Sequence, residues 1–277
     1  MKKYFILILF AGFLLPLASC EQEGGNLKVV SYNIRNSNAV DGENDWELRK
    51  EATPAMLEAV DPDVFGVQEA LPDQVEYISE HCPAYAGIGV GRDDGVSKGE
   101  HMSIFYKKDK FKLLDWGTYW LSETPDVPSI GWDARCRRTA TWAFLKQKDN
   151  GRKFYFVNTH LDHVGEEARR KGLALIVERI GDMNKHNLPM VLTGDFNVFP
   201  DDSCLTELDM MMKSARVFAA VSDTTASFNN WGREAKVIDY IYYKGFSECL
   251  DFRVVTESFA GKPFISDHYP IVSEFIY

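Results

Sequence analysis

Apolar, strand-like runs that end in polar residues recur along this chain of 277 residues, and they constrain its fold more than any other feature. Four of these runs lead directly into polar side chains, which are those of Asn33, Gln68 with Glu69, His160 and Asp195. Ligand sites in α/β sheets lie at the carboxyl ends of strands, so we expect the four junctions to face one crevice. Further polar residues follow along the chain, namely Asn197, Asp239, Asp267 and His268.

The chemistry of this set favours one class of reaction. It holds carboxylates, amides and histidines but no cluster of thiols, a combination that suits a hard divalent cation and a phosphate group. A histidine needs a carboxylate to fix its tautomer and raise its basicity before it can take a proton from water. Asp239 and Asp267 offer that partner to His268. The sequence therefore predicts metal-assisted hydrolysis of a phosphoester.

Each of these residues also has an ordinary structural interpretation. Glu69 could cap a following helix, and Asp195 with Asn197 could form a turn. His160 could be a hydrogen-bonded core histidine, and His268 an exposed residue after a turn. Together these interpretations require independent coincidences at one edge of a sheet, so we interpret the set as one site.

Strand candidates outnumber helix candidates. The runs rich in Val, Ile, Phe, Tyr and Trp are 28–33, 63–68, 102–107, 111–120, 139–146, 153–159, 189–194, 237–243, 250–255 and 271–277. The third and fourth runs are predicted to form a hairpin through residues 108–110. Asn150-Gly151 predicts a second hairpin, between the fifth and sixth runs, because this pair accepts positive φ.

Two helices are predicted, over 46–60 with a kink or late start at Pro54, and over 166–187. Hairpins and β-α-β units occur together, which indicates an α/β fold of two mixed β-sheets packed face to face with helices outside. A doubly wound parallel sheet fits this pattern less well.

The first residues are predicted to be a targeting signal rather than part of the folded domain. Lys2-Lys3 precedes an apolar stretch, 5–15, that is too short to span a bilayer, and small residues then precede Cys20. This order resembles a bacterial lipobox. We expect a signal peptide over 1–19, a lipidated Cys20 with a short tether over 20–26, and one domain over 27–277. The alternative is an ordinary signal peptide in which Cys20 is incidental.

The predicted location is therefore a bacterial cell envelope, where the protein is exported and held at a membrane through its lipid anchor only. The sequence does not indicate which face of the membrane carries it.

Four further cysteines, Cys82, Cys136, Cys204 and Cys249, are spaced too widely for a zinc knuckle or a redox pair. Their spacing is compatible both with disulfides and with free thiols.

The net charge of −10 argues against tight nonspecific binding to nucleic acid, because such proteins usually carry a basic stripe. The densest basic stretch is Arg135, Arg137 and Arg138. A nuclease is not excluded, since a bound divalent cation reverses the local charge of a carboxylate cleft.

The chain resembles the endonuclease/exonuclease/phosphatase superfamily of DNase I-like metal-dependent phosphoesterases, in a bacterial exported lipoprotein subgroup. The resemblance covers 29–270 and rests on Ser31-Tyr32-Asn33-Ile34-Arg35, Gln68-Glu69, Asn158-Thr159-His160-Leu161-Asp162, Gly194-Asp195-Phe196-Asn197, Ile238-Asp239-Tyr240 and Ser266-Asp267-His268. It implies a four-layer α/β sandwich, in agreement with the strand pattern.

The resemblance also implies roles for the residues of the site. Glu69 binds Mg²⁺ or Mn²⁺ with help from Asn33 and Asp267, and Asn33 also contacts the substrate. His268 is the general base, oriented by Asp239.

The remaining implied roles concern the phosphate. Asp195 positions the attacking water or protonates the leaving oxygen, while Asn197 and His160 hold phosphate oxygens. Glu100 matches a carboxylate that pairs with the histidine at the position of His160, and Arg138 matches a phosphate-binding arginine.

The resemblance does not separate phosphodiesters from phosphomonoesters. Nucleic acid, a phospholipid and a small phosphate ester all stay open as substrates, and the protein is expected to be a monomer. The loop 89–99 and the region 116–132 are expected to line the cleft and select the substrate. A serine hydrolase is disfavoured because the chain has no Gly-x-Ser-x-Gly motif. The alternative from another class is a catalytically inactive surface lipoprotein that binds glycan or nucleic acid.

Overall fold

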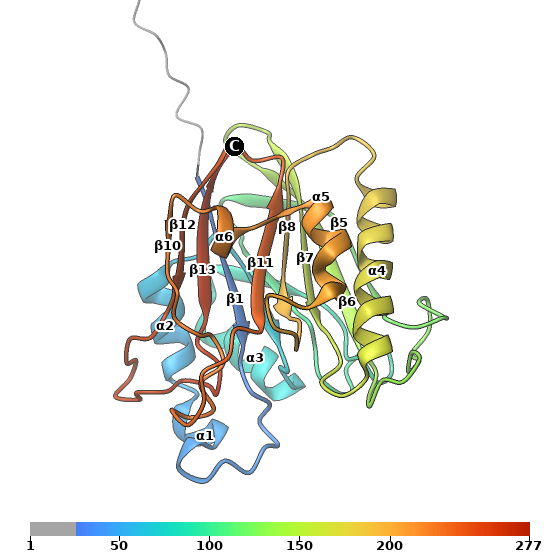
Figure 1. The fold of residues 1–277 in the computed structure, drawn as a ribbon. Helices are drawn as coiled ribbons and strands as arrows, with labels where there is room; N and C mark the ends of the chain where they lie inside the picture. The colour runs from blue at the N-terminus through green and yellow to red at the C-terminus, as the bar shows by residue number, and fades with distance from the viewer. Residues whose placement is uncertain (1–25) are drawn as a thin grey trace, which may run out of the picture.

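Apolar side chains on both faces of the central strands build a layered molecule. The computed structural model describes residues 26–277, in which two mixed β-sheets pack face to face and helices lie outside them (Figure 1). In β1 (Asn26–Asn33), Val29 packs into the core between the sheets, whereas its neighbour Val30 packs beneath the helices. The predicted four-layer fold class is confirmed.

The seven-stranded sheet has the strand order β10 (Val221–Ser222), β12 (Glu248–Val254), β13 (Ile271–Ile276), β1, β2 (Val64–Gln68), β4 (Ile104–Lys107) and β3 (Tyr85–Ile88). The six-stranded sheet has the order β5 (Phe111–Trp120), β6 (Thr139–Gln147), β7 (Lys153–His160), β8 (Met190–Asp195), β11 (Asp239–Lys244) and β9 (Lys213–Ser214). Two parallel pairs, β1 with β2 and β7 with β8, occupy the middle of the two sheets.

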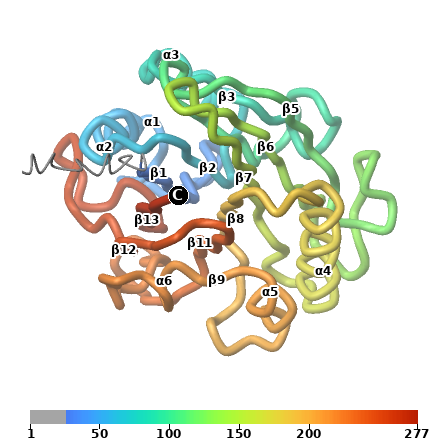
Figure 2. The backbone as a smooth tube through the Cα atoms, turned by 90° about the horizontal axis from the view of Figure 1, so that it is seen from above, coloured from blue at the N-terminus to red at the C-terminus, as the bar shows by residue number. Residues whose placement is uncertain are grey.

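The helices are η1 (Gly42–Asn44), α1 (Trp46–Arg49), α2 (Ala52–Val60), α3 (Pro72–His81), α4 (Glu166–Met183), η2 (Ser203–Leu205), α5 (Thr206–Met211) and α6 (Ala215–Phe218). Met56 of α2 and Ile78 of α3 pack on the seven-stranded sheet. Leu173 and Ile176 of α4 pack on the six-stranded sheet. Figure 2 accordingly shows α2 and α4 on opposite sides of the molecule.

One of the two predicted hairpins is wrong. β4 and β5 follow one another in the chain but belong to different sheets, because β4 already has β2 on one side and β3 on the other. With both edges of β4 occupied, the chain crosses at residues 108–110 to begin the six-stranded sheet. The hairpin at Asn150-Gly151 is confirmed: β6 and β7 are antiparallel, and Gly151 has a φ of +76°.

The helix predicted over 46–60 is two helices, α1 and α2. Pro54 lies in the first turn of α2, where a missing N–H breaks no intrahelical bond, so the late start at Pro54 is the better description. Helix α4 ends at Met183, four residues before the predicted end at residue 187. Helix α3 was not predicted, although Pro72 at its start and the bond from Leu71 N–H to the Gln74 side chain are ordinary helix-start signals.

The four cysteines of the described residues are all free thiols: Cys82, Cys136, Cys204 and Cys249.

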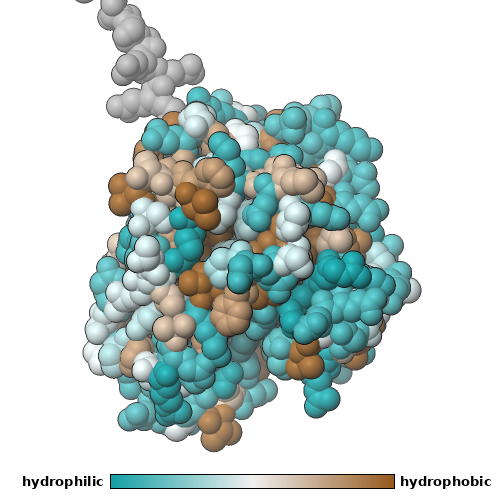
Figure 3. Space-filling model, in the orientation of Figure 1, coloured by the Kyte–Doolittle hydropathy of each residue, from teal (hydrophilic) through white to brown (hydrophobic). Residues whose placement is uncertain are grey.

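The predicted signal peptide and Cys20 lie outside the described residues. Within residues 26–277, no helix combines the length and the apolar character needed to cross a bilayer. On the face drawn in Figure 3, apolar side chains are scattered among polar ones.

Candidate active site

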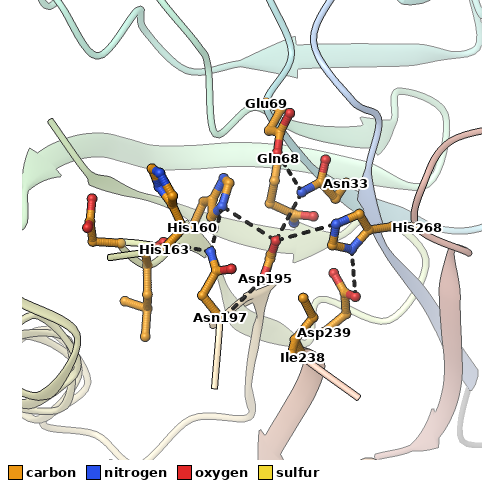
Figure 4. Close-up of polar contacts among 12 residues, drawn as sticks. Asn33, Gln68, Glu69, His160, His163, Asp195, Asn197, Ile238, Asp239 and His268 are labelled. Atoms are coloured by element: carbon orange, nitrogen blue, oxygen red, sulfur yellow. Dashed lines mark hydrogen bonds and ion pairs between the residues drawn. The ribbon is translucent and has the colours of Figure 1, made fainter. Parts of the chain in front are cut away.

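The strand register places the predicted site residues beside one another on neighbouring strands. In the six-stranded sheet, Asp195 at the end of β8 pairs with His160 of the parallel strand β7 on one side and with Asp239 of the antiparallel strand β11 on the other. In the facing sheet, Asn33 of β1 pairs with Gln68 of β2. The four strand ends therefore meet at one edge of the sandwich, as the sequence predicted (Figure 4).

A buried polar network joins the two sheets directly beneath this edge. Gln68 Nε2 donates to Asn158 Oδ1 at 2.6 Å and to Ser31 Oγ at 3.2 Å, and Thr193 Oγ1 donates to the same Asn158 oxygen at 3.0 Å. Asn158 lies so close to Gly66 that a Cβ on that glycine would stand 2.5 Å from Asn158 Cγ. The network fixes how the facing sheets meet, because each buried polar group keeps its partner only in this register.

His268 forms the centre of the site together with Asp239. Its Nδ1 donates to Asp239 Oδ2 at 2.9 Å, which leaves Nε2 directed at Asp195 Oδ2, 3.8 Å away. The loop that carries His268 is fixed by Ser266, whose Oγ donates to the Asn33 carbonyl at 2.7 Å and accepts from the His268 N–H at 3.2 Å. The bond to Asp239 fixes the imidazole tautomer, as a general base requires.

The charges of this group act on one another through a buried environment. Burial alone would lower the pKa of His268, but the charges of Asp239 and Asp195 outweigh it and raise that pKa above its ordinary value. Burial and the neighbouring charge of Asp239 raise the pKa of Asp195. Without a bound cation, the charges of these carboxylates favour the protonated form of His268.

Glu69 and Asp267 present carboxylates to the same cleft. Burial alone would raise the pKa of Glu69, but the charge of His268 and a hydrogen bond from Asn33 hold it below its ordinary value. Burial raises the pKa of Asp267, and repulsion from Glu69 adds to the effect. Glu69 also has a φ of +63°, a strained backbone for this residue type that is common at functional sites.

These carboxylates fit a hard divalent cation, which prefers oxygen ligands and would relieve their mutual repulsion. Asn33 fits less directly. Its Nδ2 donates to Glu69 Oε1 at 3.1 Å and to Asp195 Oδ2 at 3.0 Å, while its Oδ1 accepts from the Arg35 N–H at 3.1 Å. Asn33 would offer an oxygen to a cation beside Glu69 only after its amide turned over.

His160 and Asn197 form a second pair. Asn197 Nδ2 donates to the Leu161 carbonyl at 3.1 Å and to His160 Nε2 at 3.0 Å, so this nitrogen of His160 is an acceptor. Burial and the charge of Arg138 lower the pKa of His160 well below its ordinary value, which keeps the ring neutral. Asn197 reaches this position because its backbone is left-handed, with a φ of +54°.

The expected pairing of Glu100 with His160 is not formed. Glu100 is instead bound to Arg92 in an ion pair, and His160 Nδ1 is buried without a hydrogen-bond partner among the described residues. The reason is the loop between β3 and β4, which brings Arg92 and Glu100 together through the bond from Arg92 N–H to the Glu100 carbonyl at 3.0 Å.

Arg138 lines the same cleft. Its Nε donates to Asp162 Oδ2 at 3.3 Å, and its Nη2 donates to His163 Nδ1 at 2.9 Å. The Asp162 carboxylate also accepts the backbone N–H groups of Arg135, Cys136, Val164 and Gly165. Asp162 thereby connects the segment before β6 to the loop after β7.

Several cleft residues had no predicted role. Asn36 donates twice to Glu69 Oε2, at 3.2 Å from its backbone and 3.1 Å from its side chain. Arg92 and His163 line the same cleft. Arg92 belongs to the loop 89–99, which the sequence predicted to line the cleft, whereas no residue of the region 116–132 is among the lining residues. His163 follows Asp162 in the same motif as His160, and Asn36 reaches the site through a loop whose approach depends on long-range packing.

The cleft has a volume of about 600 Å³ and contains Glu69, Glu100, Arg138, His160, Asp195, Asn197, Asp267 and His268 among its lining residues. A larger groove of about 930 Å³ lies at the opposite edge of the sheets. The chief buried carboxylate there, Asp63, is already neutralised by Lys107 and Lys110, at 3.5 and 2.7 Å. The smaller cleft is therefore the candidate active site.

Comparisons with known proteins agree with this geometry. The chain is 37% identical to an endonuclease/exonuclease/phosphatase from Bacteroides vulgatus, with 91% of this chain and 98% of that chain covered and a TM-score of 0.86. It is 36% identical to a mannosyl-6-phosphatase from Bacteroides thetaiotaomicron, with 91% and 100% covered and a TM-score of 0.85. An uncharacterised protein of Acanthamoeba polyphaga mimivirus is 27% identical over 82% of this chain and 91% of its own length.

Residues 30–268 match the family model described as the Endonuclease/Exonuclease/phosphatase family. This span includes the residues of the site described above, from Asn33 to His268. The chain belongs to the endonuclease/exonuclease/phosphatase family.

Proposed function

We propose that this protein is a divalent-metal-dependent phosphoesterase in which His268 activates the attacking water. The observation that carries the proposal is the line of three side chains in which Asp239 holds His268 Nδ1 and His268 Nε2 faces Asp195 across 3.8 Å. A water molecule beside the two atoms could form a hydrogen bond to each of them. Members of this family are phosphoesterases, which agrees with the arrangement.

The carboxylates of Glu69 and Asp267 would hold the metal, Mg²⁺ or Mn²⁺. When bound, such a cation supplies positive charge that polarises a phosphoryl oxygen and lowers the pKa of the adjacent imidazole and water. Such a cation would oppose the neighbouring carboxylates, which raise the pKa of His268, and would favour the neutral imidazole that a base requires.

The other side chains position the reacting groups. Asp195 Oδ2 accepts from Asn33 Nδ2 at 3.0 Å, which fixes the carboxylate that orients the water. His268 Nε2 takes a proton from that water as its oxygen bonds to phosphorus and the ester bond on the opposite side breaks. The leaving oxygen then takes a proton from solvent. Asn197 and His160 lie on the side of Asp195 away from His268 (Figure 4). Asn197 Nδ2 would stabilise charge that grows on a phosphoryl oxygen once that oxygen replaces His160 Nε2 as its acceptor.

The substrate class receives support from a relative. The similar protein from Bacteroides thetaiotaomicron is named a mannosyl-6-phosphatase, so we propose sugar phosphates as the first substrates to test. The net charge of −10 makes long polyanions less favourable partners. We further propose that Cys20 carries the lipid anchor that holds the exported protein at a bacterial membrane.

Hydrolysis by the purified protein tests the proposal, with Mg²⁺ or Mn²⁺ against EDTA. The substrates are mannose 6-phosphate, p-nitrophenyl phosphate, bis-p-nitrophenyl phosphate, DNA, RNA and sphingomyelin. We expect metal-dependent turnover that falls by about 10²–10⁴-fold in His268→Ala, the usual contribution of a positioned base. His186→Ala, which removes an exposed histidine, is the matched control and should keep full activity.

Turnover that persists in EDTA, or wild-type turnover in His268→Ala, would overturn the mechanism. If no substrate is hydrolysed and the protein binds glycan or nucleic acid saturably, the alternative is favoured, which is a lipoprotein that binds without catalysis.

A further inference from the structure

We propose that Arg138 and His163 form a donor pair that binds the third terminal oxygen of a phosphate monoester, so that the enzyme selects monoesters over diesters. The inference rests on the proposed phosphoesterase function and adds the substrate class and the residues that determine it.

The contact between the two side chains fixes the proton of His163. A guanidinium has only donors, so the 2.9 Å contact from Arg138 Nη2 makes His163 Nδ1 an acceptor. The ring is therefore neutral and carries its proton on Nε2. Burial and the charge of Arg138 lower the pKa of His163, in agreement with a neutral ring. His163 consequently presents a permanent N–H donor rather than a titrating cation.

The pair is held rigidly. Arg138 is only 5% exposed, and its Nε is bound to Asp162, whose carboxylate also accepts four backbone N–H groups. His163 itself is exposed and lines the cleft. Its ring lies beside that of His160 in Figure 4, on the side of His160 away from His268.

Donor side chains line the cleft together with its carboxylates. Arg138, His163 and Arg92 are among the lining residues, as are Glu69, Asp195, Asp267 and His268. Arg92 Nη1 is bound to Glu100, while Arg138 gives its Nε to Asp162 and its Nη2 to His163. His163, exposed at the cleft and held by Arg138, therefore presents the N–H donor of this pair to a ligand.

Monoesters and diesters differ in the phosphate group that the Arg138–His163 pair would contact. A phosphate monoester carries close to two negative charges at neutral pH and has three terminal oxygens. A diester carries one charge and two such oxygens, and its second ester group would face donors that need a strong acceptor. A site built to hydrogen-bond one substrate group discriminates against an analogue that lacks it, because its own donors are left unpaired.

The test compares p-nitrophenyl phosphate with bis-p-nitrophenyl phosphate, which share a leaving group but differ in the number of ester bonds. We expect the wild-type protein to show the higher kcat/KM with the monoester. His163→Ala should lower monoester kcat/KM by about 10–100-fold and leave diester kcat/KM within about threefold, as expected for loss of one donor to a charged oxygen. His163→Gln, which keeps an N–H donor, should recover part of the loss.

Controls separate the two proposals. His186→Ala should leave kcat/KM unchanged with both substrates, and circular dichroism should show that the His163 variants stay folded. The donor-pair inference is wrong, and the phosphoesterase function stands, if the wild-type protein has the higher kcat/KM with the diester. The same holds if His163→Ala lowers kcat/KM equally with both substrates. If the wild-type protein hydrolyses neither ester nor any sugar phosphate with any metal, the proposed function fails and this inference fails with it.

Discussion

Asp162 is the residue whose replacement should most clearly separate a structural contribution from a catalytic one. Its carboxylate is 1% exposed and lies outside the predicted catalytic set. One oxygen accepts from Arg135, Val164 and Gly165 at 3.1, 3.0 and 2.8 Å. The other accepts from Cys136 N–H at 3.4 Å and Arg138 Nε at 3.3 Å. Asp162→Asn keeps the shape but turns one oxygen into a donor.

The expected cost follows from these contacts. The amide can keep its oxygen towards the three strong N–H donors, but its NH₂ then faces Arg138 Nε and leaves a buried guanidinium without its counter-charge. Breaking one partner of a buried ion pair costs about 3–5 kcal/mol. The loss of charge on three amide bonds adds up to about 2 kcal/mol. We therefore expect Asp162→Asn to lower the free energy of unfolding by at least about 3 kcal/mol.

Urea denaturation followed by tryptophan fluorescence measures this change. Asp133→Asn is the matched control, because Asp133 also accepts two backbone N–H groups, at the start of α4, but is exposed. Asparagine is about as good a helix cap as aspartate, so the control should stay within about 0.5 kcal/mol of the wild type. A loss below about 1 kcal/mol in Asp162→Asn would falsify the view that Asp162 organises this wall of the cleft.

Further predictions concern acid stability, packing, metal binding and location. Backbone N–H groups hold the pKa of Asp162 far below its ordinary value even though burial alone would raise it, so its contribution is complete above about pH 4 and is lost as the pH falls below that value. The free energy of unfolding of Asp162→Asn should consequently fall less between pH 5 and pH 2.5 than that of the wild type, and an equal fall would contradict the assignment. Gly66→Ala should cost about 1–3 kcal/mol in urea denaturation, because its new Cβ would stand 2.5 Å from Asn158 Cγ; an unchanged midpoint would show that the sheets are not so closely fixed. Glu69→Gln should weaken Mn²⁺ binding at least about 10-fold in titration calorimetry, and unchanged affinity would place the metal elsewhere. Cys20→Ser should move the protein from the membrane fraction to the soluble fraction, which an ordinary signal peptide would not require.

The strand framework was predictable because it is encoded locally. Each apolar run such as 154–157 has the composition of a buried strand, and the polar residue that follows it must lie at the end of that strand. The register that pairs His160 with Asp195, by contrast, depends on the whole sheet and was confirmed only by the structure. The hairpin predicted at 108–110 failed for the same reason, since local sequence does not show that both edges of β4 are occupied.

The sequence predicted that the loop 89–99 lines the cleft, but not which of its side chains enters it. Arg92 enters the cleft from a loop in which Asp94 accepts three backbone N–H groups, so its position depends on turn geometry rather than on periodicity. The proton on His163 depends on Arg138, which lies 25 residues earlier in the chain. Such contacts form only after the sheets have packed.

The direction of β1 has a consequence for how the protein would meet a membrane. The strand starts at Asn26 at one edge of the sandwich and ends at the opposite edge (Figure 1), where Asn33 contacts Glu69 of the cleft lining. Its eight residues span about 25 Å. Residues 21–25 can extend no more than about 20 Å from a lipidated Cys20. An anchored molecule would therefore keep the Asn26 edge near the bilayer and open its cleft towards the surrounding water. In that orientation it would receive phosphate esters that diffuse through the aqueous phase, and the headgroups of its own membrane would lie behind it.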